Sequence, residues 1–199
     1  MMDRLPPSRC LLFAILAVLG CGADLLTKAW IFSWPELRAG GICWLWTGHV
    51  GLQLSLNEGA LFGMGQGKVW LFAALSVAAA IAIPIWLFRF GAARDKWLTI
   101  ALGCVMGGVL GNLYDRLGLH GELWPAGPRA DTPVYAVRDW ILWQLNDEWR
   151  WPNFNIADSL LVVGAGLIFV HLLLQPRSPV GEPSAATSSA RLHSDPSGR

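Results

Sequence analysis

The stretch Val69–Phe88, VWLFAALSVAAAIAIPIWLF, decides the fold, because it runs without a single charged residue. A helix needs about 20 mostly apolar residues to cross the ~30 Å hydrocarbon core of a bilayer. The stretch therefore predicts a transmembrane helix. Pro84 lies inside it, and we expect a kink there because proline cannot donate the helical hydrogen bond.

Three further segments are of similar length and apolar character, at residues 10–32, 97–113 and 156–174. Hydrophobic residues make up 54% of the chain and charged residues 15%, whereas soluble domains carry ~25% charged residues. The sequence thus predicts an all-α membrane protein with four transmembrane helices, forming one domain over residues 1–175. The formal net charge of +1 lacks the basic footprint of a nucleic-acid-binding protein, so no nucleic-acid partner is expected.

The first of these segments has an alternative interpretation as a cleaved leader. Arg4 and Arg9 precede an apolar run, and Val18-Leu-Gly-Cys21 is similar to the cleavage box of a bacterial lipoprotein. A secreted domain would not carry three further long apolar segments, so a transmembrane helix is favoured. At the other end, residues 176–199 are rich in Pro, Ser and Gly and predict a disordered tail outside the fold.

The distribution of basic residues predicts the orientation in the membrane. Arg89, Arg94 and Lys96 crowd the short connection between the second and third spans. Because short cytoplasmic loops are enriched in Lys and Arg, this connection is expected on the cytoplasmic side. Four spans then place both termini, including the tail, in the cytoplasm, and the two longer connections, 33–67 and 114–155, on the outer side.

The outer connections show signs of local structure. Residues 50–56 alternate apolar and polar side chains, which predicts a strand, and Asn57–Gly59 predicts a turn. A small sheet at the outer membrane surface is therefore expected. The segment 137–149 is interpreted as a short helix, with Trp140, Trp143 and Trp149 suited to the membrane interface.

Polar residues at the ends of the spans are candidates for function, because charge at membrane depth is costly and is by default a sign of a site. All of them lie at the predicted outer ends. They are Asp24 and Lys28 on one face of the first span, Asn112, Asp115 and Arg116 at the end of the third, Asp139 in the last outer connection, and Asp158 at the start of the fourth. A self-neutralised structural pair is an equal alternative for Asp24 and Lys28, which lie at i and i+4. The four-residue spacing of Gly103, Gly107 and Gly111 predicts close helix packing.

The chemistry that these residues permit is that of carboxylates. The sequence has no nucleophile elbow and no zinc-protease motif, and its four Cys show no metal-ligand spacing. Two neighbouring Asp cannot both ionise, so one can act as a general base while the other donates a proton. From the residues alone, the pair is any two of Asp24, Asp115, Asp139 and Asp158. Asp115 has a ready partner in Arg116, which favours a structural role.

Five blocks of the sequence, in this order, resemble the signature of the bacterial lipoprotein signal peptidases (signal peptidase II). They are Asp24-Leu-Leu-Thr-Lys28, Asn57-Glu-Gly-Ala-Leu-Phe62, Gly107-Gly-Val-Leu-Gly-Asn-Leu-Tyr-Asp-Arg116, Val137-Arg-Asp-Trp140 and Phe154-Asn-Ile-Ala-Asp158. Together the blocks reach from Asp24 to Asp158, which is most of the chain before the tail.

The resemblance implies four transmembrane helices, a small outer β-cradle and a short outer helix. It implies an aspartic endopeptidase that cleaves a signal peptide just before a Cys carrying diacylglycerol, with Asp139 and Asp158 as the catalytic pair and with no metal or cofactor. It implies substrate-binding positions at Asn57, Gly59, Asn112, Arg116, Asn155, Asp24 and Lys28. The implied partners are diacylglyceryl-modified prolipoproteins, membrane lipids and globomycin-type inhibitors. The implied setting is a monomer in the bacterial inner membrane with its active site at the outer face.

The chain departs from the family pattern in two places. An insertion is expected within 117–136, which leaves Asp131 or Asp147 as alternatives to Asp139; the Val and aromatic neighbours favour Asp139. The aromatic residue after that Asp is Trp140 instead of the usual Phe. The predicted short helix near Trp140–Trp149 is a candidate lid over the site.

Two other function classes remain as alternatives. A small transporter would use membrane Asp residues to relay ions, but it predicts polar groups across the midplane and repeated halves. A non-catalytic lipoprotein-binding protein would keep the same motifs without turnover. The sequence favours the peptidase over both.

Overall fold

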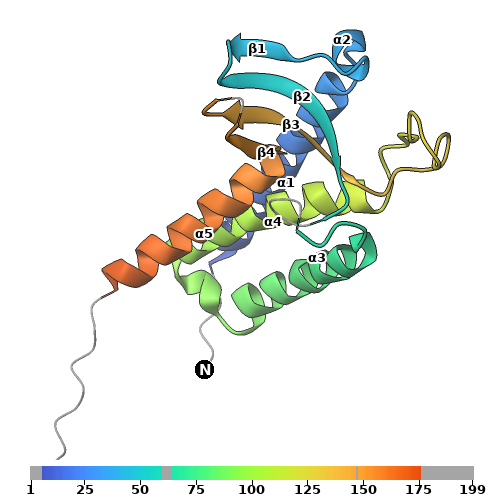
Figure 1. The fold of residues 1–199 in the computed structure, drawn as a ribbon. Coiled ribbons are helices and arrows are strands. Elements are labelled where there is room, and N and C mark those ends of the chain that lie inside the picture. The colour runs from blue at the N-terminus through green and yellow to red at the C-terminus, as the bar shows by residue number, and fades with distance from the viewer. Residues whose placement is uncertain (1–5, 60–63, 147, 176–199) are drawn as a thin grey trace, which may run out of the picture.

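The computed structural model of the chain describes residues 6–59, 64–146 and 148–175. Its element order contains four helices that are long and apolar enough to cross a membrane (Figure 1). These are α1 (Pro7–Ile31), α3 (Val69–Pro84) with its extension η2 (Ile85–Arg89), α4 (Lys96–Arg116) and α5 (Ile156–Leu174). The prediction of four membrane helices is thereby confirmed. The predicted disordered tail, 176–199, lies outside the described residues, as do positions 60–62 of the second sequence block.

The second span changes its helical pattern at Pro84. The α-helical ladder of α3 ends there and continues as the π-helical turn η2, which Phe90 N closes on Ile85 O at 3.3 Å. The physical reason is the missing N–H of Pro84, which removes one hydrogen bond from the ladder. The 3-10 turn η3 (Ala92–Arg94) then leads into α4, whose first turn is capped by the side chain of Asp95.

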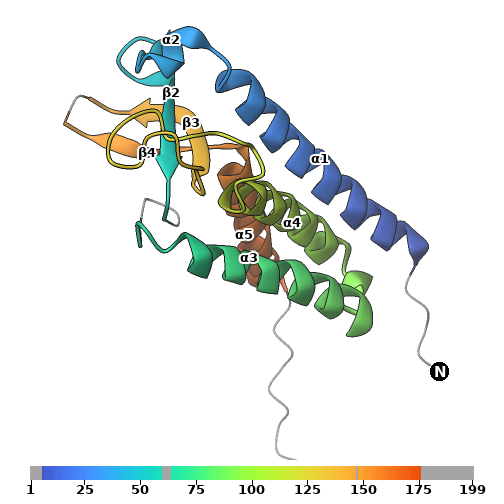
Figure 2. The same ribbon diagram turned by 90° about the vertical axis from the view of Figure 1, so that its right-hand side faces the viewer.

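A four-stranded antiparallel sheet joins the two long connections. Its order is β1-β2-β3-β4, with β1 (Cys43–Trp46) and β2 (Val50–Asn57) from the first connection, and β3 (Val137–Gln144) and β4 (Arg150–Phe154) from the second. The sheet lies at the end of the bundle where α1 ends and α5 begins (Figures 1 and 2). The strand predicted at residues 50–56 is confirmed, and the all-α class is too coarse, since the fold combines a helical bundle with this sheet.

The short helix predicted between Val137 and Trp149 is wrong, because this segment forms β3 and the turn that follows it. Branched and aromatic side chains favour strands, and pairing with β2 supplies the decisive contacts, with Ile141 opposite Leu52. Trp140 packs against the buried cluster of Ile31, Leu37 and Leu52. The predicted lid is therefore also wrong, because it required a helix at Trp140–Trp149. A different short helix, α2 (Pro35–Arg38), lies in the connection between the first and second spans.

Helix α4 occupies the centre of the bundle and packs against α1, α3 and α5. Glycines make these approaches close: a Cβ at Gly107 would lie 3.2 Å from Gly20 Cα of α1, and one at Gly108 would lie 2.4 Å from Ala157 O of α5. Gly20 therefore belongs to a packed membrane helix that runs unbroken through Cys21, which favours the transmembrane interpretation of the first segment. The close packing predicted from the glycine spacing is observed.

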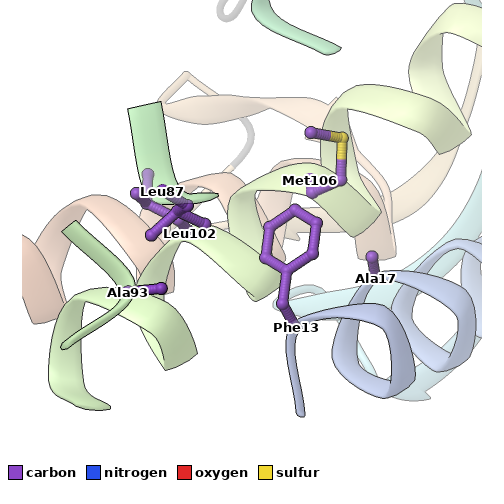
Figure 3. Close-up of a cluster of buried hydrophobic side chains, with 6 residues drawn as sticks. All are labelled: Phe13, Ala17, Leu87, Ala93, Leu102 and Met106. Atoms are coloured by element: carbon purple, nitrogen blue, oxygen red, sulfur yellow. The ribbon is translucent and has the colours of Figure 1, made fainter. Parts of the chain in front are cut away.

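The opposite end of the bundle is held by apolar side chains (Figure 3). One buried cluster contains Phe13 and Ala17 of α1, Leu87 of η2, Ala93 of η3, and Leu102 and Met106 of α4. Phe88 packs edge-on against Phe13 with ring centroids 5.5 Å apart. These side chains thus form an apolar core in the part of the bundle away from the sheet.

The close packing of Gly108 generates a stability test. Gly108→Ala would push a Cβ into the backbone of α5, and overpacking of this kind costs roughly 1–3 kcal/mol. We expect a lower thermal unfolding midpoint in detergent. Gly166→Ala is the matched control on α5, because a Cβ there meets nothing within 4 Å. Equal midpoints for the two variants would contradict the packing argument.

Candidate active site

Three fully buried charges form the support of the site. Lys28 Nζ of α1 lies 2.7 Å from Asp24 Oδ2 and 3.1 Å from Asp115 Oδ2 of α4, and all three side chains are shielded from solvent. The ammonium also donates to Asn112 Oδ1 at 3.0 Å. Asp24 Oδ1 accepts from Ala157 N at 2.9 Å, which attaches the start of α5 to α1. Since Asp24 and Lys28 are this fully paired, the structural interpretation of the pair is favoured over direct substrate contact.

Asp115 also binds Arg138 of β3. The Arg138 backbone N–H donates to Asp115 Oδ2 at 2.9 Å, and the guanidinium donates to Oδ1 through Nε at 3.1 Å and Nη2 at 2.9 Å. The structural role expected for Asp115 agrees with these contacts, but the expected partner does not. Arg116 instead donates to Gly59 O at 3.0 Å, with its guanidinium over the Phe72 ring.

Asp139 lies beside Arg138 on β3 and is almost completely buried. Consecutive strand residues point to opposite faces, so Arg138 reaches Asp115 while Asp139 takes other partners. Its Oδ1 accepts from Asn155 Nδ2 at 2.6 Å and its Oδ2 accepts from Asn57 Nδ2 at 3.2 Å. Both carboxyl oxygens are therefore held by amides.

Two asparagines connect Asp139 with Asp158. Asn155 is the N-cap of α5, and its Oδ1 accepts from Asp158 N at 2.9 Å. The Asn155 amide also donates to Asn112 Oδ1 at 3.2 Å, and Asn112 Nδ2 donates to Asp158 Oδ1 at 2.8 Å. The helix cap and the amide chain thus bring the two carboxyl groups into one network.

The electrostatics of this network favour the protonated form of Asp139. Burial raises the pKa of Asp139 to about 8, and the neighbouring Asp158 charge adds to the increase. Hydrogen bonds from Asn155 and Asn57 and the charge of Lys28 act in the opposite direction but are outweighed. A raised pKa is what is expected of one member of a carboxyl pair that shares a proton.

A cavity of about 380 Å³ opens onto Asp139. It is bounded by β2, β3 and β4, with these lining residues: Gln53–Asn57, Gln66, Asp139, Arg150, Pro152 and Asn153. Its walls offer amides, a guanidinium and the hydroxyl of Ser55, which suits a peptide backbone with its alternating donors and acceptors. The cavity gives a polar substrate segment access to the Asp139 carboxyl group.

The residues predicted for the site are brought together by these contacts. Asp139 bonds to Asn57 and Asn155, Asp158 to Asn112, Arg116 to Gly59, and Lys28 joins Asp24 to Asn112. Asp131, an alternative to Asp139, is instead exposed in the 117–136 loop at a positive φ of 61°. Asp147, the other alternative, lies outside the described residues.

Sequence reasoning missed two contributors to the site. Arg138 binds Asp115, and the signal for it was its position directly before Asp139 on a strand, which sends the two side chains to opposite faces. Gln66 donates to Asn57 Oδ1 at 3.1 Å and accepts from Glu58 N at 3.2 Å. No motif in the sequence marks Gln66.

Comparison with known proteins places this geometry in a family. The family model described as Signal peptidase (SPase) II matches residues 16–174. The chain belongs to the signal peptidase II family. It is therefore an aspartic endopeptidase of the membrane, and family membership supports the cleavage of lipoprotein signal peptides.

Individual relatives agree with this assignment. The chain is similar to a lipoprotein signal peptidase of Rhodopirellula baltica, with 50% identity over 178 residues, covering 89% of this chain and 78% of the relative. A lipoprotein signal peptidase of Symbiobacterium thermophilum is 33% identical over 84% of this chain and 97% of its own length. A solved bacterial membrane enzyme shares the fold with a TM-score of 0.63 at 23% identity, over 85% of this chain and 90% of that chain.

The buried charges generate a second stability test. Lys28→Met removes the cation between Asp24 and Asp115, and breaking a buried ion pair from one side costs roughly 3–5 kcal/mol. We expect a large loss of unfolding free energy in detergent. Glu122→Gln is the control, because its pair with Arg38 is partly exposed and such pairs contribute about 0–1 kcal/mol. Similar losses in both variants would contradict the proposed support.

Proposed function

We propose that this protein removes signal peptides from diacylglyceryl-modified prolipoproteins by cutting just before the lipidated Cys, with Asp139 and Asp158 as the catalytic pair. The observation that carries the proposal is the amide chain Asn155–Asn112, which links the two carboxyl groups beside a cavity that opens onto Asp139. One carboxyl group on β3 and one on the first turn of α5 suit a substrate that enters between the sheet and the bundle.

In the proposed reaction, Asp158 acts as the general base and Asp139 as the general acid. The Asp158 carboxylate takes a proton from water as the water oxygen forms a bond to the scissile carbonyl carbon. Asp139, protonated because its pKa is about 8, donates its proton to the carbonyl oxygen. The C–N bond of the tetrahedral intermediate then breaks. Asp158 gives its proton to the leaving amine of the Cys, and Asp139 recovers a proton from the diol, which restores both groups.

The surrounding polar residues position this pair in our proposal. Asn57 and Asn155 fix the plane of the Asp139 carboxyl group, and Asn112 fixes that of Asp158. Arg116 holds the turn at Gly59, so that backbone groups of the turn can meet the substrate. Asp24 and Lys28 contribute indirectly, by holding Asn112 and the start of α5 in place.

The proposal includes the placement in the membrane. The sheet and the catalytic pair lie at the outer face of the bacterial inner membrane, both termini are cytoplasmic, and the unit of residues 1–175 works as a monomer without a metal or cofactor. The basic connection with Arg89, Arg94 and Lys96 supports this orientation. Globomycin-type inhibitors would then occupy the cavity beside Asp139, while membrane lipids surround the exposed apolar faces of α1, α3 and α5.

The transporter alternative is less well supported. A path for ions would need polar groups along the bundle, whereas the end away from the sheet is packed with Phe13, Leu87, Leu102 and Met106. A non-catalytic binding protein differs from the peptidase in turnover alone, so the cleavage assay below decides between them.

Cleavage of a diacylglyceryl-modified prolipoprotein by the purified protein in detergent tests the proposal. We expect wild type to cut, and Asp139→Asn and Asp158→Asn to lose activity by at least about a hundredfold while remaining folded, since each removes a proton-transfer group worth about 10²–10⁴-fold. Asp131→Asn is the control, because asparagine tolerates the positive φ of that position. Inactive Asp131→Asn with active Asp139→Asn would contradict the assignment, and no cleavage by wild type would favour the binding protein.

The pH dependence of the reaction is a separate test of the acid. Because Asp139 must be protonated, kcat/KM is expected to fall as the pH rises through about 8. The Asn57 amide favours the ionised form, so Asn57→Ala raises the pKa of Asp139 and should move this fall to higher pH. Asn146→Ala, in the turn between β3 and β4, should leave the profile in place. A shift to lower pH in Asn57→Ala would contradict the role of Asp139.

A further inference from the structure

A second cavity of about 430 Å³ adjoins the active-site cavity across strand β2. Both cavities touch Leu54, Ser55 and Leu56, so β2 forms the wall between them. The volume lies within the ~300–1,000 Å³ range of ligand pockets. Nothing in the reaction described above uses this second cavity, which we call the outer groove.

The outer groove is largely apolar and carries a polar rim. Phe32 and Leu37 contribute the side next to α1 and α2, and Leu123, Trp124 and Pro125 contribute the opposite side. At the rim Arg38 Nη2 lies 2.8 Å from Glu122 Oε1, which connects the two sides. Arg38 also donates to Phe32 O through Nε at 2.5 Å. A groove of this composition suits apolar side chains carried on a polar backbone.

The side of the outer groove formed by residues 122–134, within the expected insertion, is held in a defined conformation by hydrogen bonds and an ion pair. Its two arms are tied by Trp124 N to Thr132 O at 3.0 Å and by Val134 N to Glu122 O at 3.0 Å. Arg129 stacks over the Trp124 ring at 4.0 Å and reaches Glu58 Oε1 at 2.6 Å. The arms are therefore fixed both to each other and to the turn after β2, next to Asn57.

The third side of the outer groove is the edge of strand β2. Strand β1 pairs with β2 only from Val50 to Leu52, while β3 pairs with it as far as Asn57. Within the described part of the chain, Leu54–Leu56 thus have no strand beside them on the side of β1. Figure 1 shows this part of β2 running past the end of β1 and beside the 117–136 loop, and Figure 2 shows the same neighbours. An uncovered strand edge is a template for an extended peptide.

We propose that the outer groove binds the substrate chain that follows the cleaved bond, as an extended segment along the edge of β2. The inference rests on the proposed function, because it takes the scissile bond to lie beside Asp139. A chain that passes from one side of β2 to the other crosses two strand spacings of ~4.8 Å each. Because an extended chain advances ~3.3 Å per residue, this crossing takes about three residues. The groove would therefore hold residues from about the fourth position after the scissile bond onward.

This mode of binding fits a peptidase that acts on many sequences. The strand edge recognises the peptide backbone, which all substrates share, and the apolar walls accept side chains of varied shape. The segment contributes to binding without touching the reacting atoms. It should lower KM for substrates that are long enough to reach the groove and leave shorter ones unaffected.

Two substrates and two variants test the inference. One substrate is a diacylglyceryl-modified prolipoprotein with a long chain after the Cys, and the other is the same molecule ending two residues after the Cys. Ala126→Trp fills the outer groove with an indole, and Ala130→Trp places the same side chain on the same loop outside the lining. The measurement is KM and kcat for both substrates with wild type and each variant.

We expect wild type to show a KM about tenfold lower for the long substrate, equivalent to about 1.4 kcal/mol of binding. Ala126→Trp should abolish this preference, and Ala130→Trp should keep it. Equal KM values for both substrates with wild type would overturn the groove while leaving the proposed function standing. An equal loss of kcat/KM for both substrates in Ala126→Trp would also overturn the proposed role of the groove. Failure of wild type to cut either substrate would overturn the proposed function itself and the groove with it.

Discussion

The need to pair charges inside the bundle governs the rest of this structure. An ion buried without a partner is costly, so Asp115 in the core must be surrounded by cations. It receives Lys28 from α1 and both the guanidinium and the backbone N–H of Arg138 from β3. One carboxylate thus fixes a helix and a strand relative to α4. Asp24 repeats the device on a smaller scale by accepting the N–H of Ala157 at the start of α5.

The candidate site follows from this support by simple geometry. Once Arg138 is directed to Asp115, the alternation of the strand turns Asp139 to the opposite face, where Asn57 and Asn155 meet it. The N-cap residue Asn155 holds the first turn of α5 and, through Asn112, the carboxyl group of Asp158. The cap that starts a membrane helix therefore also sets the separation and the shared environment of two acidic groups. Burial in that environment raises the pKa of Asp139.

The sequence predicted the helices well because each is decided by its own apolar length. The sequence also predicted which polar residues gather at the site. Burying charged side chains at membrane depth is costly, so the spans contain few of them. The prediction failed for β3, because that strand depends on pairing with β2, which lies 80 or more residues earlier, and local periodicity does not contain this contact. The same limit explains why Arg116, the neighbour in sequence, was taken as the partner of Asp115. The choice of Asp139 and Asp158 among four Asp residues came from family resemblance and not from residue chemistry.

The loop at 117–136 can be long without disturbing the site, because its two ends are fixed before and after it. Asp115 precedes the loop and Arg138 follows it, and three hydrogen bonds join the two residues directly. The entropy of closing a loop grows only slowly with its length, by about 0.6 kcal/mol for each doubling. An insertion within this loop would therefore leave the register of β3, and with it the direction of Asp139, unchanged. Residues added within the loop would instead alter the surface beside β2, where the loop borders the outer groove.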